Sequence, residues 1–155
     1  MRLLLIRHAD VEASWRGRCY GRSEPHLSPA GRKQAETVAA ALEDEALAAI
    51  YSSPALRCWE TAELLARRQR LALQTLAAFR EIDFGLFEGL TFDQIADHFP
   101  TEFAGWMSAP WAITFPAGES WADLCRRVAA GLADLRRRHV EDTIALVAHS
   151  ARAKR

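Results

Sequence analysis

The stretch RLLLIRHAD, residues 2–10, joins an unbroken aliphatic run to an arginine and a histidine. Residues 3–6 contain no polar side chain, which is typical of a strand buried on both faces of a parallel sheet. Such a strand needs parallel neighbours and helices that cover both faces. The stretch therefore predicts an α/β fold, with Arg7 and His8 at the carboxyl end of its first strand.

The rest of the chain alternates helix and strand signals in a way that supports this fold. Ser28 is a candidate N-cap before Pro29, which suits the first position of a helix, and Ser53 and Pro54 repeat the pattern. A longer helix is expected to start at Ser120. Further strands are expected at residues 48–52, 71–76 and 143–148. We therefore expect a three-layer α/β/α sandwich with a mostly parallel sheet, in a single domain, residues 1–155.

One aromatic-rich stretch interrupts the alternation. We interpret it, at about residues 82–118, as a cap subdomain with one or two short helices, one of them near residues 92–99. Its aromatic side chains either form a small core of their own or line a substrate wall. The sequence leaves these two interpretations open.

Composition limits the partners and the compartment. The chain has 155 residues and a formal net charge of +0, which favours neither a nucleic-acid nor a membrane partner. No apolar run is long enough to span a membrane, and the run at the N-terminus is too short for a signal peptide. The three cysteines are widely spaced and lack a C-x-x-C pair, which indicates reduced thiols and no zinc site. We expect a cytoplasmic protein.

The strand ends bring together residues that are distant in sequence. Ligands of open α/β sheets bind where the carboxyl ends of the strands meet, so Arg7, His8 and His149 are expected to share one site. Arg57 lies in the first turn of the helix expected after Ser53, where helix N–H groups favour an anion. Two arginines, two histidines and a helix start predict a phosphate pocket.

Hydrolysis at such a pocket also needs a proton donor for the leaving group. Three carboxylates just beyond the third strand are candidates, namely Glu81, Asp83 and Glu88. A carboxyl group must be protonated to donate, so the acid should have a pKa raised by burial. The histidines His26, His98 and His139 show no metal-ligand spacing.

Several segments together resemble a known family. They are RHAD (7–10), YGRSEPHLSPAGRKQA (20–35), SSPALRCWETA (52–62), FREIDFGLFEGL (79–90), FPAGESWADLCRRV (115–128) and LVAH (146–149). In this order they cover nearly the whole chain and are similar to the histidine phosphatase superfamily, which includes the phosphoglycerate mutase-like enzymes. The resemblance is closest to the α-ribazole phosphatase branch.

The resemblance implies a metal-independent phosphatase with no cofactor. His8 would be the nucleophile that becomes phosphorylated, and Arg7 and Arg57 would bind the phosphoryl oxygens. Glu81 aligns with the family's proton donor, with Asp83 or Glu88 as alternatives. His149 would contact the phosphoryl group. Two arginines and a cationic histidine can neutralise the transferring group without Mg²⁺.

The resemblance also implies a small phosphorylated metabolite as substrate. In α-ribazole phosphatases this is α-ribazole 5′-phosphate, an intermediate of cobalamin biosynthesis, and Ser23 lies where relatives often bind substrate. The alternatives are a phosphoglycerate mutase-type or broad-specificity sugar phosphatase, or a catalytically weak phosphate-ligand-binding protein.

Two features depart from the family pattern. Ala9 replaces the glycine that commonly follows the first histidine, and relatives continue past the second histidine where this chain reads SARAKR, residues 150–155. We interpret the chain as shortened at its C-terminal end. Lost packing would leave strand edges or apolar surface uncovered, so we expect self-association into a homo-oligomer.

Overall fold

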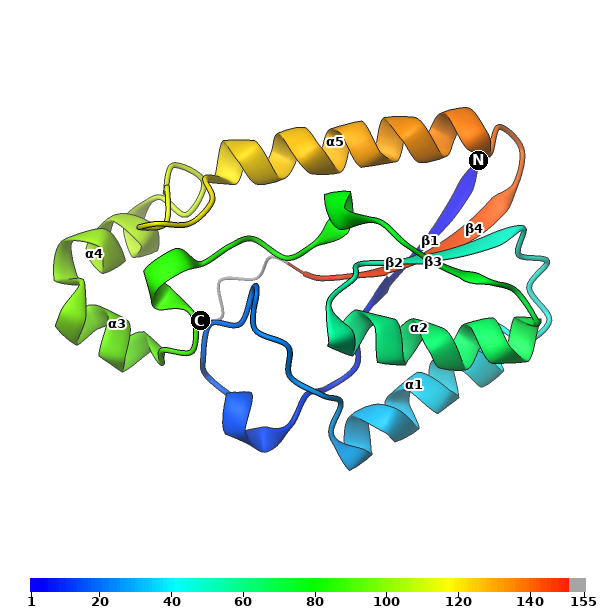
Figure 1. Ribbon diagram of the computed structural model, residues 1–155, viewed down its shortest axis with the longest axis horizontal. Coiled ribbons are helices and arrows are strands. Elements are labelled where there is room, and N and C mark those ends of the chain that lie inside the picture. Colours follow the sequence, from blue (N-terminus) through cyan, green and yellow to red (C-terminus); the bar gives the residue numbers. More distant parts are fainter. Residues whose placement is uncertain (151–155) are drawn as a thin grey trace.

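The computed structural model describes residues 1–150 and has a parallel sheet at its centre (Figure 1). Its strands, in spatial order, are β1 (Arg2–Arg7), β4 (Thr143–Ala148), β2 (Ala49–Ser52) and β3 (Leu73–Thr75). The last strand in sequence thus lies beside the first, and Arg7 is paired with Ala148. Because both strands run the same way, His8 and His149 leave the sheet side by side.

Helices cover both faces of this sheet, which confirms the three-layer α/β/α sandwich. Helices α1 (Pro29–Ala41) and α2 (Leu56–Gln69) pack on one face, and α5 (Trp121–Arg138) packs on the other (Figure 1). Ile50 and Val147 point to the α2 side, whereas Tyr51 and Leu146 point to the α5 side. This alternation fixes the strand register, because a slip by one residue would exchange the two faces.

Two of the three expected helix starts are confirmed. The Ser28 hydroxyl accepts a hydrogen bond from the N–H of Gly31, and Pro29 is the first residue of α1. The Ser120 hydroxyl accepts from the N–H of Asp123 at the start of α5. The expectation for α2 was wrong, because this helix begins at Leu56, two residues beyond Pro54, and its N-cap has no side-chain hydrogen bond.

The expectation that β1 is buried on both faces is also wrong. This strand lies at the edge of the sheet, and none of the six residues that it spans is fully buried, with Leu5 67% exposed. An apolar groove of about 320 Å³ runs between β1 and α5 and is lined by Leu3, Leu5, Trp121 and other side chains. The aliphatic run predicted the strand correctly but not its position in the sheet.

Two short helices, α3 (Phe92–His98) and α4 (Pro100–Ser108), lie at the end of the molecule away from the sheet (Figure 1). They close over an aromatic cluster in which the rings of Phe87, Phe99, Trp106 and Phe115 contact one another. The limits of a cap subdomain at about 82–118 stay a prediction. No helix within residues 1–150 is long and apolar enough to cross a membrane.

Candidate active site

His8 follows β1 directly, and its ring is held by the backbone beside it. The Nδ1 atom lies 2.8 Å from the carbonyl oxygen of Ala9. A carbonyl oxygen only accepts, so Nδ1 carries the proton and Nε2 is left with a free lone pair. Burial lowers the pKa of His8 to about 4, and the positive charges of Arg57 and Arg7 act in the same direction. The imidazole is therefore neutral and nucleophilic at neutral pH.

His149 lies beside His8, with the ring centroids 5.4 Å apart. Its Nε2 is 2.9 Å from the hydroxyl of Ser53, and that hydroxyl already accepts a hydrogen bond from the N–H of Ala55. Nε2 therefore carries the proton of His149 and donates to this hydroxyl, because the other ring nitrogen accepts: NH2 of Arg57, which can only donate, lies 3.4 Å from Nδ1. That nitrogen is 3.9 Å from a carboxylate oxygen of Glu81.

The charge of His149 differs from the sequence expectation. Burial lowers the pKa of His149 to about 2, and the neighbouring Arg57 and His8 act in the same direction. A cationic histidine was expected at this position, but without a bound anion the ring is neutral. The positive charge around the two histidines comes instead from guanidinium groups.

Arg57 projects from the first turn of α2 and is completely buried. Its terminal nitrogens donate to the carbonyl oxygens of Ser23 at 3.0 Å, Tyr20 at 2.9 Å and Gly21 at 3.3 Å. Its Nε is the buried side-chain nitrogen for which residues 1–150 offer no hydrogen-bond partner. A buried, unpaired donor is costly, so Nε is available to an anion that enters the site.

The start of α2 is not free to bind a ligand as the sequence suggested. The N–H of Leu56 donates to the carboxylate of Glu24 at 2.5 Å, and Arg80 lies 3.4 Å from the same carboxylate. The Glu24 carboxylate thus occupies the position at the N-terminus of α2 where the helix dipole would favour a phosphate. Phosphate binding at this site falls to side chains rather than to the helix start.

Glu88 is one of the three carboxylates considered as proton donors, and it is saturated with hydrogen bonds. It accepts from the backbone N–H groups of Gly21, Arg22, Ser23 and Phe84, and from the Ser23 hydroxyl at 2.7 Å. These hydrogen bonds hold residues 20–23 in place. Gly21 is required there, because a Cβ would lie 1.9 Å from the carbonyl oxygen of Ile82.

Asp83 is also engaged, whereas Glu81 is in the position that an acid needs. Asp83 pairs with Arg22 at 3.0 Å and accepts from the N–H of Gly85. Glu81 is buried beside His149, and burial raises its pKa, although the N–H of Ile82 and the charge of Arg57 act in the opposite direction. The burial of Glu81 favours its protonated form, as proton donation requires.

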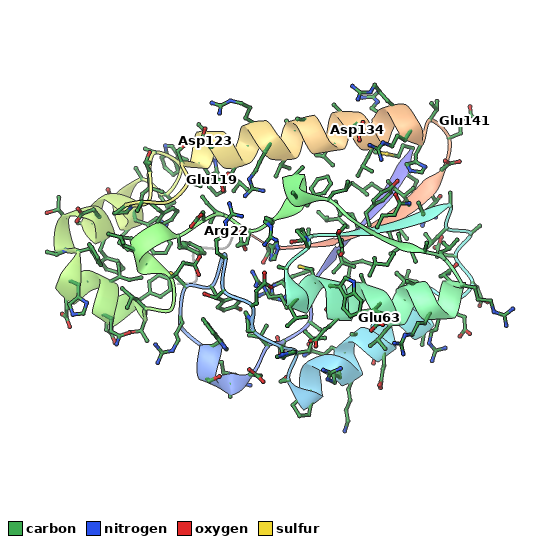
Figure 2. The ribbon with its side chains drawn as sticks, viewed as in Figure 1. Arg22, Glu63, Glu119, Asp123, Asp134 and Glu141 are labelled. Carbon is green, nitrogen blue, oxygen red and sulfur yellow. The ribbon has the colours of Figure 1, made fainter. Side chains whose placement is uncertain are left out.

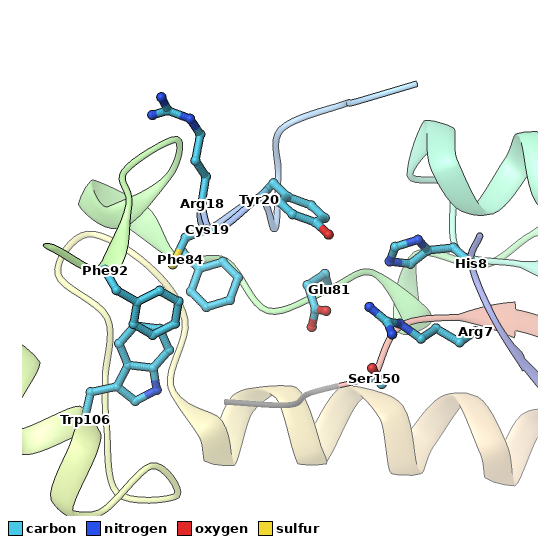
Figure 3. A pocket seen from close by; sticks show the side chains of 11 residues that line it. Arg7, His8, Arg18, Cys19, Tyr20, Glu81, Phe84, Phe92, Trp106 and Ser150 are labelled. Atoms are coloured by element: carbon cyan, nitrogen blue, oxygen red, sulfur yellow. The ribbon is translucent and has the colours of Figure 1, made fainter. Parts of the chain in front are cut away.

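Glu81 and His8 face one pocket of about 180 Å³ (Figure 3). Arg7 and His8 lie at one end of it, and Phe84, Phe92 and Trp106 lie at the other. Figure 3 shows Glu81 between these ends, with the ring of Tyr20 above it. Arg57 and His149 do not line this pocket but lie buried in contact with each other, with Arg57 NH2 and His149 Nδ1 3.4 Å apart. Cationic groups thus surround the nucleophile, and aromatic rings surround the far end.

The hydroxyl of Ser23, the expected substrate contact, donates to Glu88, and Ser23 does not line the pocket. A role of Ser23 in substrate binding stays a prediction.

Sequence reasoning missed Ser53 and Tyr20. Ser53 was read only as a helix start, although its position directly after a strand signals a site residue. Among residues 1–150, no group of three His, Cys, Asp or Glu side chains could hold a metal ion.

Fold and site together define an α/β protein with a histidine and arginine pocket at the carboxyl ends of its strands. The model of the histidine phosphatase superfamily (branch 1) matches residues 3–154. The chain belongs to this superfamily and is a phosphatase of the hydrolase class. The family resemblance inferred from the sequence is thus confirmed.

Relatives and solved structures agree with this assignment. Phosphoserine phosphatase 1 of Hydrogenobacter thermophilus is 35% identical over 150 residues, which are 97% of this chain and 71% of the relative. The structure of the mycobacterial glucosyl-3-phosphoglycerate phosphatase Rv2419c is 28% identical with a TM-score of 0.86, and the match covers 96% of this chain and 73% of that one. The structure of the α-ribazole phosphatase of Shigella flexneri is 25% identical with a TM-score of 0.88, and the match covers 96% of this chain and 74% of that one. Other relatives are longer: the match to the bifunctional protein Rv2228c of Mycobacterium tuberculosis covers 36% of the length of that protein.

Proposed function

We propose that the chain is a phosphomonoesterase that carries the phosphoryl group on Nε2 of His8 and then transfers it to water. The observation that carries the proposal is the state of His8, whose Nδ1 is bonded to Ala9 and whose pKa is lowered to about 4. Nε2 is therefore unprotonated at neutral pH and faces the pocket that Arg7 and Glu81 also line.

In the first step, Nε2 of His8 attacks phosphorus while the bond to the leaving oxygen breaks. Glu81 gives its proton to that oxygen, Arg7 stabilises the charge on the phosphoryl oxygens, and buried Arg57 adds its positive charge beside His8. In the second step, the Glu81 carboxylate takes a proton from water, whose oxygen bonds to phosphorus as the N–P bond breaks. A contact of His149 with the transferring group stays a prediction, because His149 touches His8 but does not line the pocket. No step needs an external oxidant, reductant or metal ion.

The substrate that the pocket supports best is a small phosphate ester with an aromatic or other planar leaving group. Phe84, Phe92 and Trp106 line the end away from His8, and the rings of Phe92 and Trp106 stack with centroids 5.3 Å apart. Such a wall favours a ring over a small charged group. α-Ribazole 5′-phosphate fits this chemistry, and with this substrate the chain would act in cobalamin biosynthesis in the cytoplasm. The similarity of this chain to the α-ribazole phosphatase of Shigella flexneri supports the same substrate.

A second substrate class has its own support. A polar pocket of about 300 Å³ adjoins His8 and is lined by Arg7, Asp10, Arg16 and Tyr20. Its arginines suit a carboxylate or second phosphate on the substrate, and the similarity to phosphoserine phosphatase 1 of Hydrogenobacter thermophilus favours the same class. Values of kcat/KM for α-ribazole 5′-phosphate, phosphoserine, 3-phosphoglycerate and sugar phosphates decide between the classes.

The reaction itself is tested with p-nitrophenyl phosphate in EDTA. We expect the wild-type chain to turn over the substrate and to form a phosphoenzyme that is stable in base and labile in acid. His8→Ala should remove both, with a loss of at least about 1,000-fold in kcat, since the covalent route is closed. Activity that persists in His8→Ala, or that disappears in EDTA, would refute the proposal. Vanadate binding without any turnover would support a phosphate-ligand-binding protein instead.

A further inference from the structure

The segment that carries Glu81 has no regular secondary structure of its own. It follows a single 3-10 turn, Ala77–Phe79, and residues 80–84 belong to no helix or strand. Phe79 and Ile82 are buried and anchor the segment on either side of Glu81. The backbone carbonyl groups between them have no sheet or helix partners, so side chains must satisfy them.

Arg127 of α5 supplies most of these partners. Its NH1 donates to the carbonyl oxygens of Ala78 at 2.9 Å and Arg80 at 2.7 Å, and its NH2 donates to that of Glu81 at 3.0 Å. Its remaining donors bind the carboxylate of Glu119, with Nε at 2.6 Å and NH2 at 2.8 Å. All five N–H donors of the guanidinium are thereby used.

Glu119 holds the same segment from the other side. It lies just before α5 (Figure 2), and its backbone N–H donates to the carbonyl of Asp83 at 2.9 Å, while its carboxylate accepts from the N–H of Asp83 at 3.3 Å. The Arg127 and Glu119 side chains are only 22% and 13% exposed, so the pair is shielded from water. Together the two residues contact the backbone before and after Glu81.

These contacts fix the direction of the Glu81 side chain. The carbonyl of Arg80 belongs to the peptide plane before Glu81, and the carbonyl of Glu81 belongs to the plane after it. Since peptide units are planar, holding both carbonyls sets the two backbone dihedral angles of Glu81 and hence the direction of its Cα–Cβ bond. A small misplacement of a proton donor is costly, because proton transfer requires hydrogen-bond distance to the leaving oxygen.

We propose that Arg127, braced by Glu119, is the positioning residue that aims the Glu81 carboxyl group at the leaving-group oxygen. The inference rests on the proposed function, in which Glu81 is the general acid. Arg127 does not line the pocket, and its donors are all used within the chain, so it acts through Glu81 and not on the phosphate. Lysine cannot replace it, since an ammonium group has three donors and no planar fork.

The test compares substrates that differ in their need for a proton. The leaving group of 2,4-dinitrophenyl phosphate departs without one, whereas that of glycerol 2-phosphate requires it. We expect Arg127→Gln to lower kcat for glycerol 2-phosphate by about 100-fold, with little change in KM, because general acid catalysis contributes about that much. The loss on 2,4-dinitrophenyl phosphate should be under about 3-fold. Arg127→Lys should show the same pattern to a smaller extent, and it also serves if Arg127→Gln does not fold.

The matched control is Arg126→Gln, on the same helix, where the side chain is 73% exposed and pairs with Asp123. It should leave both rates unchanged. Equal losses on both substrates in the Arg127 variants, or no loss on either, would overturn the inference. Glu81→Gln separates this failure from a failure of the proposed function. If Glu81→Gln itself shows no leaving-group dependence, Glu81 is not the acid, whatever the Arg127 variants do.

Discussion

The nucleophile and the general acid of the proposed reaction have pKa values shifted in opposite directions. Burial lowers the pKa of His8 to about 4 and raises that of Glu81. The shared cause is desolvation, which disfavours a cationic imidazole and an anionic carboxylate alike. Each shift thus favours the neutral form of its group, which is the form that the proposed mechanism requires of both.

These shifts predict the pH dependence of the reaction. His8 must be neutral, so kcat/KM should rise with an apparent pKa near 4. Glu81 must be protonated, so kcat/KM should fall again above the raised pKa of Glu81, and Glu81→Gln should lack this fall. The measurement is kcat/KM for an alkyl phosphate across the pH range, corrected for ionisation of the substrate. A rising limb near 6.5, the ordinary value for histidine, would contradict a buried neutral His8.

At the residue scale, the sequence predicted which residues meet but not how they are bonded. Arg7, His8, Arg57, Glu81 and His149 were expected at one place, and the structure brings their side chains or rings together there. Their roles remain a proposal. The carbonyls that hold Arg57 could not be predicted, because they belong to an irregular loop, residues 20–23.

At the element scale, Glu88 ties that loop to the segment after Glu81. Its carboxylate accepts from backbone N–H groups on both sides, and the carbonyls of the same loop hold Arg57. Glu88→Gln would place an NH₂ group against these donors. We expect a loss of about 2 kcal/mol in the free energy of unfolding, as for hydrogen bonds to a charged group, together with a raised KM.

Denaturant unfolding and steady-state kinetics measure these two effects. Glu63→Gln is the control, because Glu63 forms a surface pair with Arg67 one turn along α2 and should contribute at most about 0.5 kcal/mol. Equal stability of the Glu88 and Glu63 variants would show that the five hydrogen bonds of Glu88 do not hold the loop.

The helices were predicted better than their surroundings because caps and periodicity are local signals. Ser28 and Ser120 cap their helices as expected. The start of α2 was misplaced because the Ser53 hydroxyl serves Ala55 and His149 instead of capping the helix. The place of β1 at the edge of the sheet is set by pairing with β4, more than 130 residues further along, and an aliphatic run carries no signal of it.

At the scale of the whole molecule, the layered α/β/α fold followed from the alternation of elements and from the family resemblance. The feature that bears on the expected self-association is the open edge of β1, with Leu5 67% exposed. Edge strands with apolar side chains are templates for pairing with another chain. The expected self-association therefore stays a prediction, and this edge is where we would test it.

We expect the wild-type chain to associate at micromolar concentration and Leu5→Lys to weaken that association. Because Leu5 is exposed, the change should alter the free energy of unfolding by no more than about 0.5 kcal/mol. Light scattering during size-exclusion chromatography gives the mass of each variant. Val140→Lys, at a residue 70% exposed and outside the strands, is the control. A wild-type chain that stays monomeric at these concentrations would contradict the prediction.

The pKa of His8 lies below that of Glu81, which is the reverse of the ordinary order for an imidazole and a carboxyl group. This order decides which of the two groups holds a single proton. At the ordinary values of 6.5 and 4.5, an imidazole and a carboxyl group sharing one proton would keep it on nitrogen in all but about one molecule in 100. With His8 near 4 and Glu81 above its ordinary value, the same proton stays on oxygen in most molecules. In the state that holds this one proton, His8 is the neutral nucleophile and Glu81 is the acid, and the guanidinium groups of Arg7 and Arg57 remain uncompensated by this pair. Such a pocket should also retain its own product, so inorganic phosphate should compete with every substrate.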